Sequence, residues 1–306
     1  MKKKKINILI SWRLLIDNMH NYKSIFKKNN INFDVVKCDQ HLKENSLIKI
    51  IHKYDGVICG DDEFTKKVLN SAKRLKIISK WGTGIDSIDK DCAKRKGIIL
   101  KNSPGAFSSS VSQHAIALIF ALLRKLVVNH NDIAKNKWTK PSCEVIDGKT
   151  IGIIGFGKIG KEIHKKLSVF DVKFLFNDLK KINKQNSSLK NILKNSDILI
   201  ISCDLNKTSK HLIKYNELRI MKKDAYIINI SRGAIIKNLD LSKILKLKKI
   251  AGAGLDVFED EPLKNNLFKN LDNCILTSHN AFNSKKLIHS INDKSVNNII
   301  NFFSKN

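Results

Sequence analysis

The stretch "GKTIGIIGFGKIGKEIHKKL", residues 148–167, decides the fold of this chain. An apolar run, TIGII, leads directly into Gly155, Gly157 and Gly160, which are spaced as GxGxxG, and a helix-like sequence follows. Glycines with this spacing alone are weak evidence, but between a strand and a helix they indicate a dinucleotide-binding loop. The first glycine permits a tight turn, the second lets the backbone approach a pyrophosphate, and the third allows close packing of helix on strand.

The rest of this loop is expected to bind the cofactor as well. Phe156, Lys158 and Ile159 complete the loop and the first turn of the helix, whose free N–H groups would receive phosphates. The next strand-like run ends at Asp178, about 20 residues beyond the loop, where an acidic residue accepts hydrogen bonds from a ribose diol. An acid there repels a 2′-phosphate, so it favours NAD over NADP, whereas the nearby Lys180 and Lys181 would favour the reverse.

Strand-like and helix-like runs alternate along the chain. The runs expected to form strands are INILI, FDVVKC, DGVIC, KIISK, TIGIIG, VKFLFND, DILIIS, AYIINI, IAGAGLDV and CILT. They are rich in Ile and Val and show little polar alternation, as strands buried on both faces of a parallel sheet do. This rhythm predicts an α/β protein whose parallel sheets are covered by helices on both faces.

Two breaks divide the chain. KNSPGAFSSS, residues 101–110, places Pro and Gly before a long helix, predicted over 108–135, that is apolar on more than one face. Such a helix serves either the core alone or the core and a dimer interface. The second break, SHNAFNS at 278–284, precedes a last amphipathic helix. A chain that crosses twice places its N- and C-terminal segments in one domain and its middle in the other.

The composition bears on the class of partner. The chain has 306 residues, of which 42% are hydrophobic, so it can form two domains with proper cores. Its formal net charge of +29 suggests nucleic acid. However, the lysines are spread along the whole chain without interleaved aromatic residues, and only six of the 57 basic residues are Arg. These features argue against a nucleic-acid partner.

The cysteines and the N-terminus bear on location. Six Cys are scattered without a CxxC pair or zinc-like spacing, which favours reduced thiols in a cytoplasmic protein without a metal site. The lysine-rich start is followed by a short apolar run and then Arg13, so it predicts a first strand rather than a signal peptide. No apolar run approaches about 20 residues, and we therefore expect no membrane span.

Several blocks together resemble one family, the D-isomer-specific 2-hydroxyacid dehydrogenases, which include phosphoglycerate dehydrogenase. In chain order the resembling stretches are LKIISKWGTGIDSIDKDCAKRKGIILKNSPGAFSSSV, GKTIGIIGFGKIG, MKKDAYIINISRGAII, AGAGLDVFEDEP and CILTSHNA. The resemblance implies two Rossmann-like, doubly wound parallel-sheet domains with the active site in the cleft between them. It implies a substrate-binding domain of residues 1–102 plus 283–306, an NAD-binding domain of residues 103–282, and a homodimer formed through the helix after residue 108.

The resemblance also assigns catalytic roles. Arg232 matches the family arginine that grips the substrate carboxylate and polarises the 2-keto oxygen, for which the planar guanidinium fork suits better than an ammonium. His279 matches the acid/base residue, and Glu261 matches the carboxylate that hydrogen-bonds this histidine. Outside this context, the arginine would be an ordinary strand-end residue, the histidine structural, and the glutamate one acid of a solvated loop.

Binding roles follow in the same way. Gly82, Thr83 and Gly84 resemble the loop whose backbone N–H groups receive the substrate carboxylate, where glycine permits close approach; a plain turn is the simpler reading. Asp256 resembles the residue that contacts the nicotinamide carboxamide, although a helix-cap or turn role is an alternative.

Some positions depart from the family pattern. Ser278 replaces the Pro that commonly precedes the catalytic His, and SCDLN, residues 202–206, replaces a His-x-Pro-Leu loop. Where phosphoglycerate dehydrogenases tend to have phosphate-facing arginines, this chain has Asp61, Asp62 and Glu63. These acids would repel a phosphate and favour a non-phosphorylated or cationic substrate, or they would simply cap a helix beginning close by.

The sequence therefore predicts an NAD-dependent, phosphoglycerate dehydrogenase-like enzyme that interconverts a small 2-keto acid and its D-2-hydroxy acid. The alternative is an NAD-sensing binding or corepressor-type protein on the same fold. A sensor need not keep Arg232, Glu261 and His279 together, so their joint presence favours the enzyme.

Overall fold

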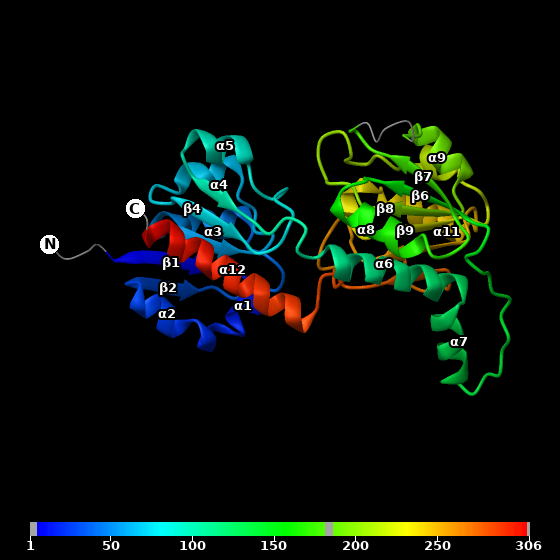
Figure 1. Cartoon of the computed structure of the whole chain (residues 1–306), viewed down its shortest axis with the longest axis horizontal. Helices are drawn as coiled ribbons and strands as arrows, with labels where there is room; N and C mark the ends of the chain where they lie inside the picture. Colours follow the sequence, from blue (N-terminus) through cyan, green and yellow to red (C-terminus); the bar gives the residue numbers. More distant parts are fainter. Residues whose placement is uncertain (1–4, 181–185, 305–306) are drawn as a thin grey trace. The chain divides into compact units, whose positions relative to one another are not determined.

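The computed structural model describes residues 5–180 and 186–304, and the chain divides into two compact units. Unit 1 comprises residues 1–107 and 283–306, and unit 2 comprises residues 108–282. Each unit is built on one sheet whose strand pairs are all parallel and whose two faces are covered by helices (Figure 1). The predicted α/β class with two parallel-sheet domains is confirmed.

Unit 1 has five strands in the order β2-β1-β3-β4-β5. They are β1 (Ile6–Ile10), β2 (Ile31–Val35), β3 (Gly56–Cys59), β4 (Ile77–Lys80) and β5 (Ile99–Lys101). The three-residue edge strand β5 was not among the expected runs, because it is largely exposed and too short to show a pattern. The strand order reverses between β1 and β3, a point where sheets of this kind bind ligands beyond their carboxyl ends.

The helices of unit 1 form two layers. One core cluster joins the sheet to α1, α2 and the C-terminal α12, and another joins it to α3, α4 and α5. The helical segments are α1 (Arg13–Ile16), α2 (Lys23–Lys28), α3 (Glu44–Ile50), α4 (Lys66–Ser71), α5 (Lys90–Arg95), α12 (Lys285–Ser304) and the 3-10 turns Met19–Asn21 and Ile51–Lys53. Figure 1 shows α12, in red, against the blue and cyan sheet of the N-terminal segment.

Unit 2 has six strands in the order β11-β10-β9-β8-β6-β7. They are β6 (Thr150–Ile154), β7 (Lys173–Asn177), β8 (Ile198–Ile201), β9 (Tyr226–Asn229), β10 (Gly252–Leu255) and β11 (Cys274–Leu276). The helical segments are α6 (Ser108–Leu123), α7 (Leu126–Ile133), α8 (Lys158–Leu167), α9 (Leu189–Asn195), α10 (Tyr215–Leu218), α11 (Asn238–Lys246) and the 3-10 turn Gly233–Ile235. The strand order reverses between β6 and β8, next to the glycine loop.

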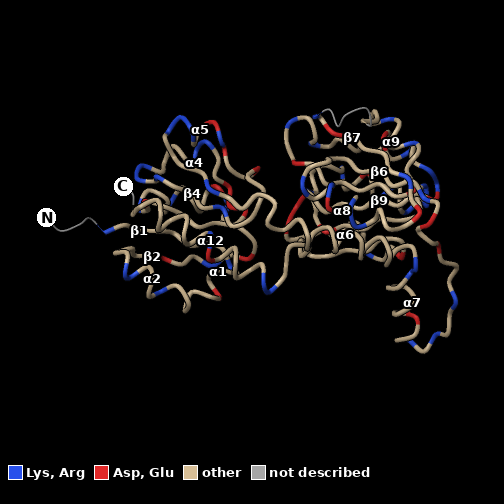
Figure 2. The backbone as a smooth tube through the Cα atoms, in the orientation of Figure 1, with Lys and Arg blue, Asp and Glu red and all other residues tan. Residues whose placement is uncertain are grey.

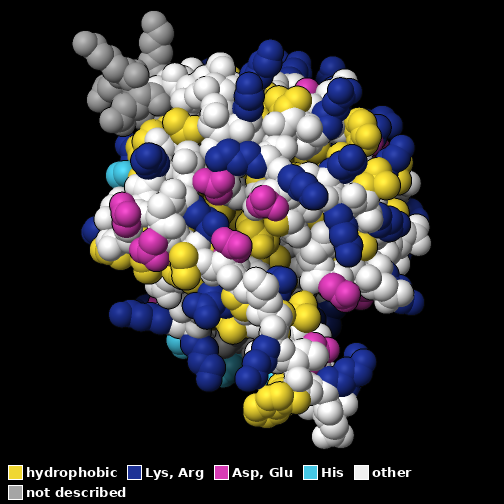
Figure 3. All heavy atoms as spheres, turned by 90° about the vertical axis from the view of Figure 1, so that its right-hand side faces the viewer, with side chains coloured by type: hydrophobic (Ala, Val, Ile, Leu, Met, Phe, Trp, Pro, Cys, Tyr) yellow, Lys and Arg dark blue, Asp and Glu magenta, His cyan; other side chains and the backbone are white. Residues whose placement is uncertain are grey.

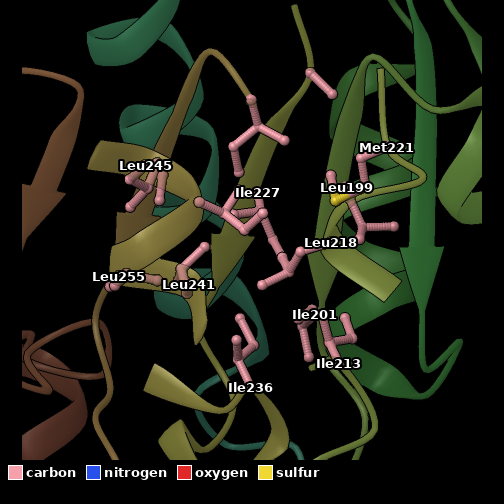
Figure 4. Packing of buried hydrophobic residues seen from close by; sticks show 14 of the residues in the cluster. Leu199, Ile201, Ile213, Leu218, Met221, Ile227, Ile236, Leu241, Leu245 and Leu255 are labelled. Carbon is pink, nitrogen blue, oxygen red and sulfur yellow. The ribbon is translucent and has the colours of Figure 1, made fainter. Parts of the chain in front are cut away.

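The main core of unit 2 explains why its strands read as unbroken apolar runs. Every residue of β8, β9 and β10 is buried, because helices cover both faces. On one face α9, α10 and α11 pack against side chains such as Ile201, Ile227 and Leu255 (Figure 4). On the other face α6 packs against β9, β10 and β11 and touches α8. Each fully buried Ile or Leu contributes about 1.5–3 kcal/mol to the stability of this layer.

The single helix predicted over residues 108–135 is wrong in one respect. It is broken into α6 and α7, which meet at an angle of 61°. Lys125 at the junction has φ 48°, a left-handed conformation that ends the first helix. The sequence contains no Gly or Pro at this point that would predict the break. Helix α7 has no buried residue and, with the segment after it, extends away from the sheet of unit 2 (Figure 1).

Within residues 5–180 and 186–304 no single helix is long and apolar enough to cross a membrane; only α6 and α7 taken together would pass on length and composition. Lysine and arginine occur along the whole of both units (Figure 2), and the face in Figure 3 shows them dispersed among acidic and uncharged side chains rather than gathered in one patch.

Candidate active site

Most of the site residues predicted for unit 2 lie in loops that follow the carboxyl ends of its parallel strands. Ile154, Ile201, Asn229, Leu255 and Leu276 form a continuous row of paired residues across β6, β8, β9, β10 and β11. The glycine loop follows the first of these strands, and the loops of the arginine, of Asp256 and of His279 follow the last three. Parallel strands therefore bring together segments that are far apart in the sequence.

The glycine loop has the geometry that its three glycines predict. Gly155 has φ 91°, and a Cβ there would collide with the backbone of Cys203. A Cβ on Gly160 would collide with the carbonyl oxygen of Gly155 where α8 packs on the strand. Gly157 is different, because a Cβ on it would meet nothing within 4 Å and its φ is −75°. Packing therefore explains two of the glycines, and the open space at Gly157 fits a ligand's close approach.

Asp178 is tied to the same loop. Its carboxylate accepts hydrogen bonds from the backbone N–H of Phe156 at 2.6 Å and from that of Lys180 at 2.8 Å. The ring of Phe156 packs on Phe176 of β7, with 4.2 Å between ring centroids. Each carboxylate oxygen accepts one of these bonds and has a second lone pair, so the residue can still receive a hydroxyl. Lys181 lies outside the described residues.

The SCDLN segment follows β8 and supports both neighbours. The carbonyl oxygen of Cys203 accepts a hydrogen bond from the hydroxyl of Ser231, and its backbone fills the space left by Gly155. Burial raises the pKa of the Cys203 thiol to about 12. The thiol therefore stays protonated at neutral pH and acts as a small packing group.

Arg232 lies three residues beyond β9 and its loop is rigidly held. The buried side chain of Asn229 accepts from the N–H of Ser231 at 3.2 Å and donates to the carbonyl oxygen of Arg232 at 3.0 Å. Gly233 lies against the backbone of Phe258, where a Cβ would not fit. The guanidinium donates to the carbonyl oxygen of Ser231 at 2.8 Å and is half-buried. The loop thus fixes the backbone from which the arginine side chain projects.

His279 and Glu261 form the pair that the family resemblance implies. Nδ1 of His279 lies 2.7 Å from Oε2 of Glu261, and the N–H of Phe258 donates to the other carboxylate oxygen at 2.9 Å. Both side chains are about 20% exposed, so the pair is largely shielded from water. A carboxylate on Nδ1 fixes the tautomer and makes Nε2 the ring nitrogen that would exchange a proton with a substrate.

Asp256 occupies the turn role that the sequence left open. It is 1% exposed and follows β10. Its carboxylate accepts from the hydroxyl of Thr277 at 2.6 Å and from the N–H groups of Asn280 and Ala281 at 2.8 and 3.0 Å. Its carbonyl oxygen accepts from the N–H of His279 at 2.7 Å. Contact with a nicotinamide carboxamide remains a prediction.

The acidic run of unit 1 is bound into local structure. Asp62 is 1% exposed, and its carboxylate accepts from the hydroxyl of Ser11 and from the N–H of Leu42. Asp61 lies 3.1 Å from the buried ammonium of Lys80. Glu63 accepts from Lys43 and from a backbone N–H of α3, and the helix it precedes is capped instead by Thr65. None of these acids caps α4, but Glu63 accepts from the first N–H of α3, so the helix-terminus reading holds for a different helix.

The predicted carboxylate loop of unit 1 follows β4. Gly82 has φ 123°, and its carbonyl oxygen accepts from the N–H of Ser103 at 2.8 Å. The hydroxyl of Thr83 donates to the carbonyl oxygen of the same serine at 3.0 Å, and Asn102 donates to the carbonyl oxygen of Thr83 at 2.6 Å. Gly84 completes a loop whose turn needs a glycine at its first position.

Comparison with known proteins identifies the family of this chain. The family model described as "D-isomer specific 2-hydroxyacid dehydrogenase, NAD binding domain" matches residues 116–281, more than half of the chain. A glyoxylate reductase of Thermofilum pendens is 37% identical over 251 residues, which cover 77% of this chain and 74% of that protein. A hydroxypyruvate reductase of Thermotoga maritima is 33% identical and covers 78% of this chain and 82% of its own length.

A solved structure is similar over nearly the whole chain. The D-lactate dehydrogenase of Aquifex aeolicus, complexed with NAD and lactic acid, has a TM-score of 0.87 and 25% identity, with 98% of this chain and 96% of that chain covered. Both the sequence blocks and the fold thus lead to one assignment. The chain belongs to the D-isomer-specific 2-hydroxyacid dehydrogenases.

Proposed function

We propose that this chain is an NAD-dependent reductase of a small 2-keto acid, with glyoxylate and hydroxypyruvate as the first candidates. The family consists of oxidoreductases that act on 2-hydroxy acids. Glyoxylate reductases and a hydroxypyruvate reductase are among its relatives, together with a D-3-phosphoglycerate dehydrogenase that matches over 48% of its own length. The reductases favour such substrates over a phosphoglycerate dehydrogenase-like activity and give no support to the sensor alternative. The observation that carries the proposal is the His279–Glu261 pair, 2.7 Å apart, at the same sheet edge as the arginine loop.

The loop after β6 fits a nicotinamide dinucleotide. The space beside Gly157 admits a close ligand, and the N-terminus of α8 offers N–H groups to a pyrophosphate. When bound, such a cofactor supplies the hydride for reduction and accepts it in oxidation. Asp178 supports NAD over NADP, because its carboxylate would repel a 2′-phosphate. With one keto acid at fixed concentration, kcat/KM should be higher for NADH than for NADPH; the opposite preference would overturn this assignment.

The chain's own residues would handle the substrate and the proton. Arg232 would hold the substrate carboxylate through its planar fork and polarise the 2-keto oxygen. Nε2 of His279 would donate a proton to that oxygen during reduction and take one from the hydroxyl during oxidation. Glu261 would stabilise the imidazolium that oxidation produces. In this proposal unit 1, with the Gly82–Gly84 loop, binds the substrate, and unit 2 binds NAD.

The proposal includes a homodimer formed through the helices after residue 108. Helix α7 has no buried residue, yet Leu126, Val127 and Ile133 on it are apolar, and Trp138 just beyond is 84% exposed. Apolar side chains projecting in this way are typical of a surface that a second copy covers. Sedimentation equilibrium should give twice the chain mass at micromolar concentration; a monomer would contradict the dimer and leave the chemistry untouched. The cytoplasmic location remains a prediction.

The decisive experiment is an assay of NADH oxidation against a panel of 2-keto acids. We expect turnover with glyoxylate or hydroxypyruvate. Tight NADH binding with no turnover of any keto acid would overturn the enzyme and favour the NAD-sensing alternative. An apolar 2-keto acid such as pyruvate and a phosphorylated one such as phosphohydroxypyruvate complete the panel, because they test what the pocket requires beyond the carboxylate.

A further inference from the structure

The turn that carries His279 has an unusual backbone. His279 has φ 51°, in the left-handed region that residues with a side chain rarely adopt. A histidine in this conformation is disfavoured locally by about 1–2 kcal/mol, so the surroundings must hold it there. The orientation of its imidazole toward Glu261 depends on that backbone.

Asp256 stabilises this backbone conformation of His279. Both of its carboxylate oxygens accept N–H groups from the two residues after His279, and its carbonyl oxygen accepts the N–H of His279 itself. One buried residue thus binds three successive N–H groups of the turn. The turn keeps its shape as long as the carboxylate keeps its position.

A second histidine reaches this carboxylate from another element. His114 lies on α6, and its Nε2 is 3.0 Å from the hydroxyl oxygen of Thr277 and 3.4 Å from Oδ1 of Asp256. The hydroxyl of Thr277 has a single hydrogen, and it donates that hydrogen to Oδ1 of Asp256 at 2.6 Å. Thr277 can therefore only accept from His114, so Nε2 of His114 carries a hydrogen. The order of donation is His114 to Thr277 to Asp256.

We propose that His114 is a positioning residue for the catalytic histidine, acting through Thr277 and Asp256. The proposal rests on the proposed function for its kinetic part only. Helix α6 is a rigid base, because it packs against β9, β10 and β11, whose ends carry the site loops. A donor anchored there fixes the carboxylate that in turn fixes the backbone of His279.

Two pairs of variants test this chain of hydrogen bonds. His114→Leu removes the donor, whereas His114→Gln keeps an N–H at a similar reach; Thr277→Val removes the hydroxyl, whereas Thr277→Ser keeps it. We expect Leu and Val to lower kcat roughly tenfold, and Gln and Ser to retain most of the rate. The double variant His114→Leu/Thr277→Val should be no slower than the slower single, because both break one chain. His52→Leu, an exposed histidine of unit 1, is the matched control.

A spectroscopic readout separates this proposal from the proposed function. In the full-length protein labelled with ¹⁵N at histidine, His114 should show the signals of the Nε2–H tautomer. The ring signals of His279 should move in His114→Leu and return toward wild type in His114→Gln. If no keto acid is turned over, these signals still show whether His114 positions His279. Unchanged His279 signals in His114→Leu, or equal changes with Leu and Gln, would overturn the positioning role.

Discussion

At the scale of single residues, the proposed substrate binding depends on Arg232, one of six arginines among 57 basic residues. Arg232→Lys keeps the charge and loses the bidentate fork, and Asn229 and Gly233 keep the loop in place. A hydrogen bond to a charged group contributes about 1.5–3 kcal/mol, so we expect kcat/KM to fall roughly ten- to a hundredfold with little change in NADH affinity. Steady-state kinetics measures the first, and fluorescence titration the second.

The matched control for this substitution is Arg219→Lys. Arg219 is exposed, lies just after α10 and has no role in the proposed site. Its replacement should change neither quantity. If Arg232→Lys behaved like this control, the arginine would not be the carboxylate clamp.

The histidine pair makes a prediction about pH. Reduction needs the protonated imidazole, so kcat/KM for reduction should be high at low pH and fall as pH rises. Glu261→Gln removes the negative charge beside Nδ1 of His279, which disfavours the imidazolium. The midpoint of the fall should therefore move to lower pH by on the order of one unit, and the rising limb for oxidation should move the same way.

The chain offers a close control for this experiment. His211 and Glu259 form a second histidine–glutamate pair, with 2.6 Å between Nε2 and Oε1, outside the proposed chemistry. Glu259→Gln should leave the pH profile in place. If the pH profile of kcat/KM were the same in wild type and in Glu261→Gln, Glu261 would not act on His279 in catalysis.

At the scale of elements, substitutions at two glycines of the loop between β6 and α8 should affect different quantities: one the free energy of unfolding, the other the affinity for NADH. Gly155→Ala places a Cβ against the backbone of Cys203 at a φ of 91°, so the free energy of unfolding should fall by about 1–3 kcal/mol. Gly157→Ala meets nothing within 4 Å, so the unfolding free energy should stay within about 0.5 kcal/mol of wild type.

For Gly157→Ala the loss should appear in the Kd for NADH, which we expect to rise roughly tenfold because the new methyl occupies the approach to the pyrophosphate. Urea unfolding and NADH fluorescence titration measure the two quantities. Normal NADH binding by a stable Gly157→Ala variant would show that the loop does not hold the dinucleotide.

The helices and strands also show which parts of the fold can be predicted from the sequence alone. Nine of the ten expected strand runs contain a strand of the structure, and the run FDVVKC overlaps only the second half of β2, which begins at Ile31 and is largely exposed. The break at Lys125 has no signal in the sequence, because its left-handed turn is made by a lysine, without Gly or Pro. The sequence cannot choose between the two roles of Asp256, since its hydrogen-bond partners lie beyond β11 and on α6. His114 gave no signal, because one histidine on an apolar helix looks structural until the fold places Thr277 beside it.

At the scale of the whole molecule, the large positive charge does not alter the functional assignment. Lysines occupy both units without gathering into one patch on the face viewed, and basic charge of this kind attracts anionic substrates and cofactors in general (Figures 2 and 3). What the two units have in common is parallel-sheet architecture with loops at the carboxyl edge. The site chemistry of unit 2, together with the family, therefore decides the function more than the surface does.

The handedness of the product tests most directly whether this chain is a D-isomer-specific reductase of 2-keto acids. Hydroxypyruvate would be reduced with NADH by the full-length chain, and the glycerate formed would be resolved into its enantiomers by chiral chromatography. If the chain is a D-isomer-specific reductase of small 2-keto acids, D-glycerate should form only when NADH is present. The variant His279→Ala should form no D-glycerate while it still binds NADH. Formation of L-glycerate, or of no glycerate by a chain that binds NADH, would contradict the account.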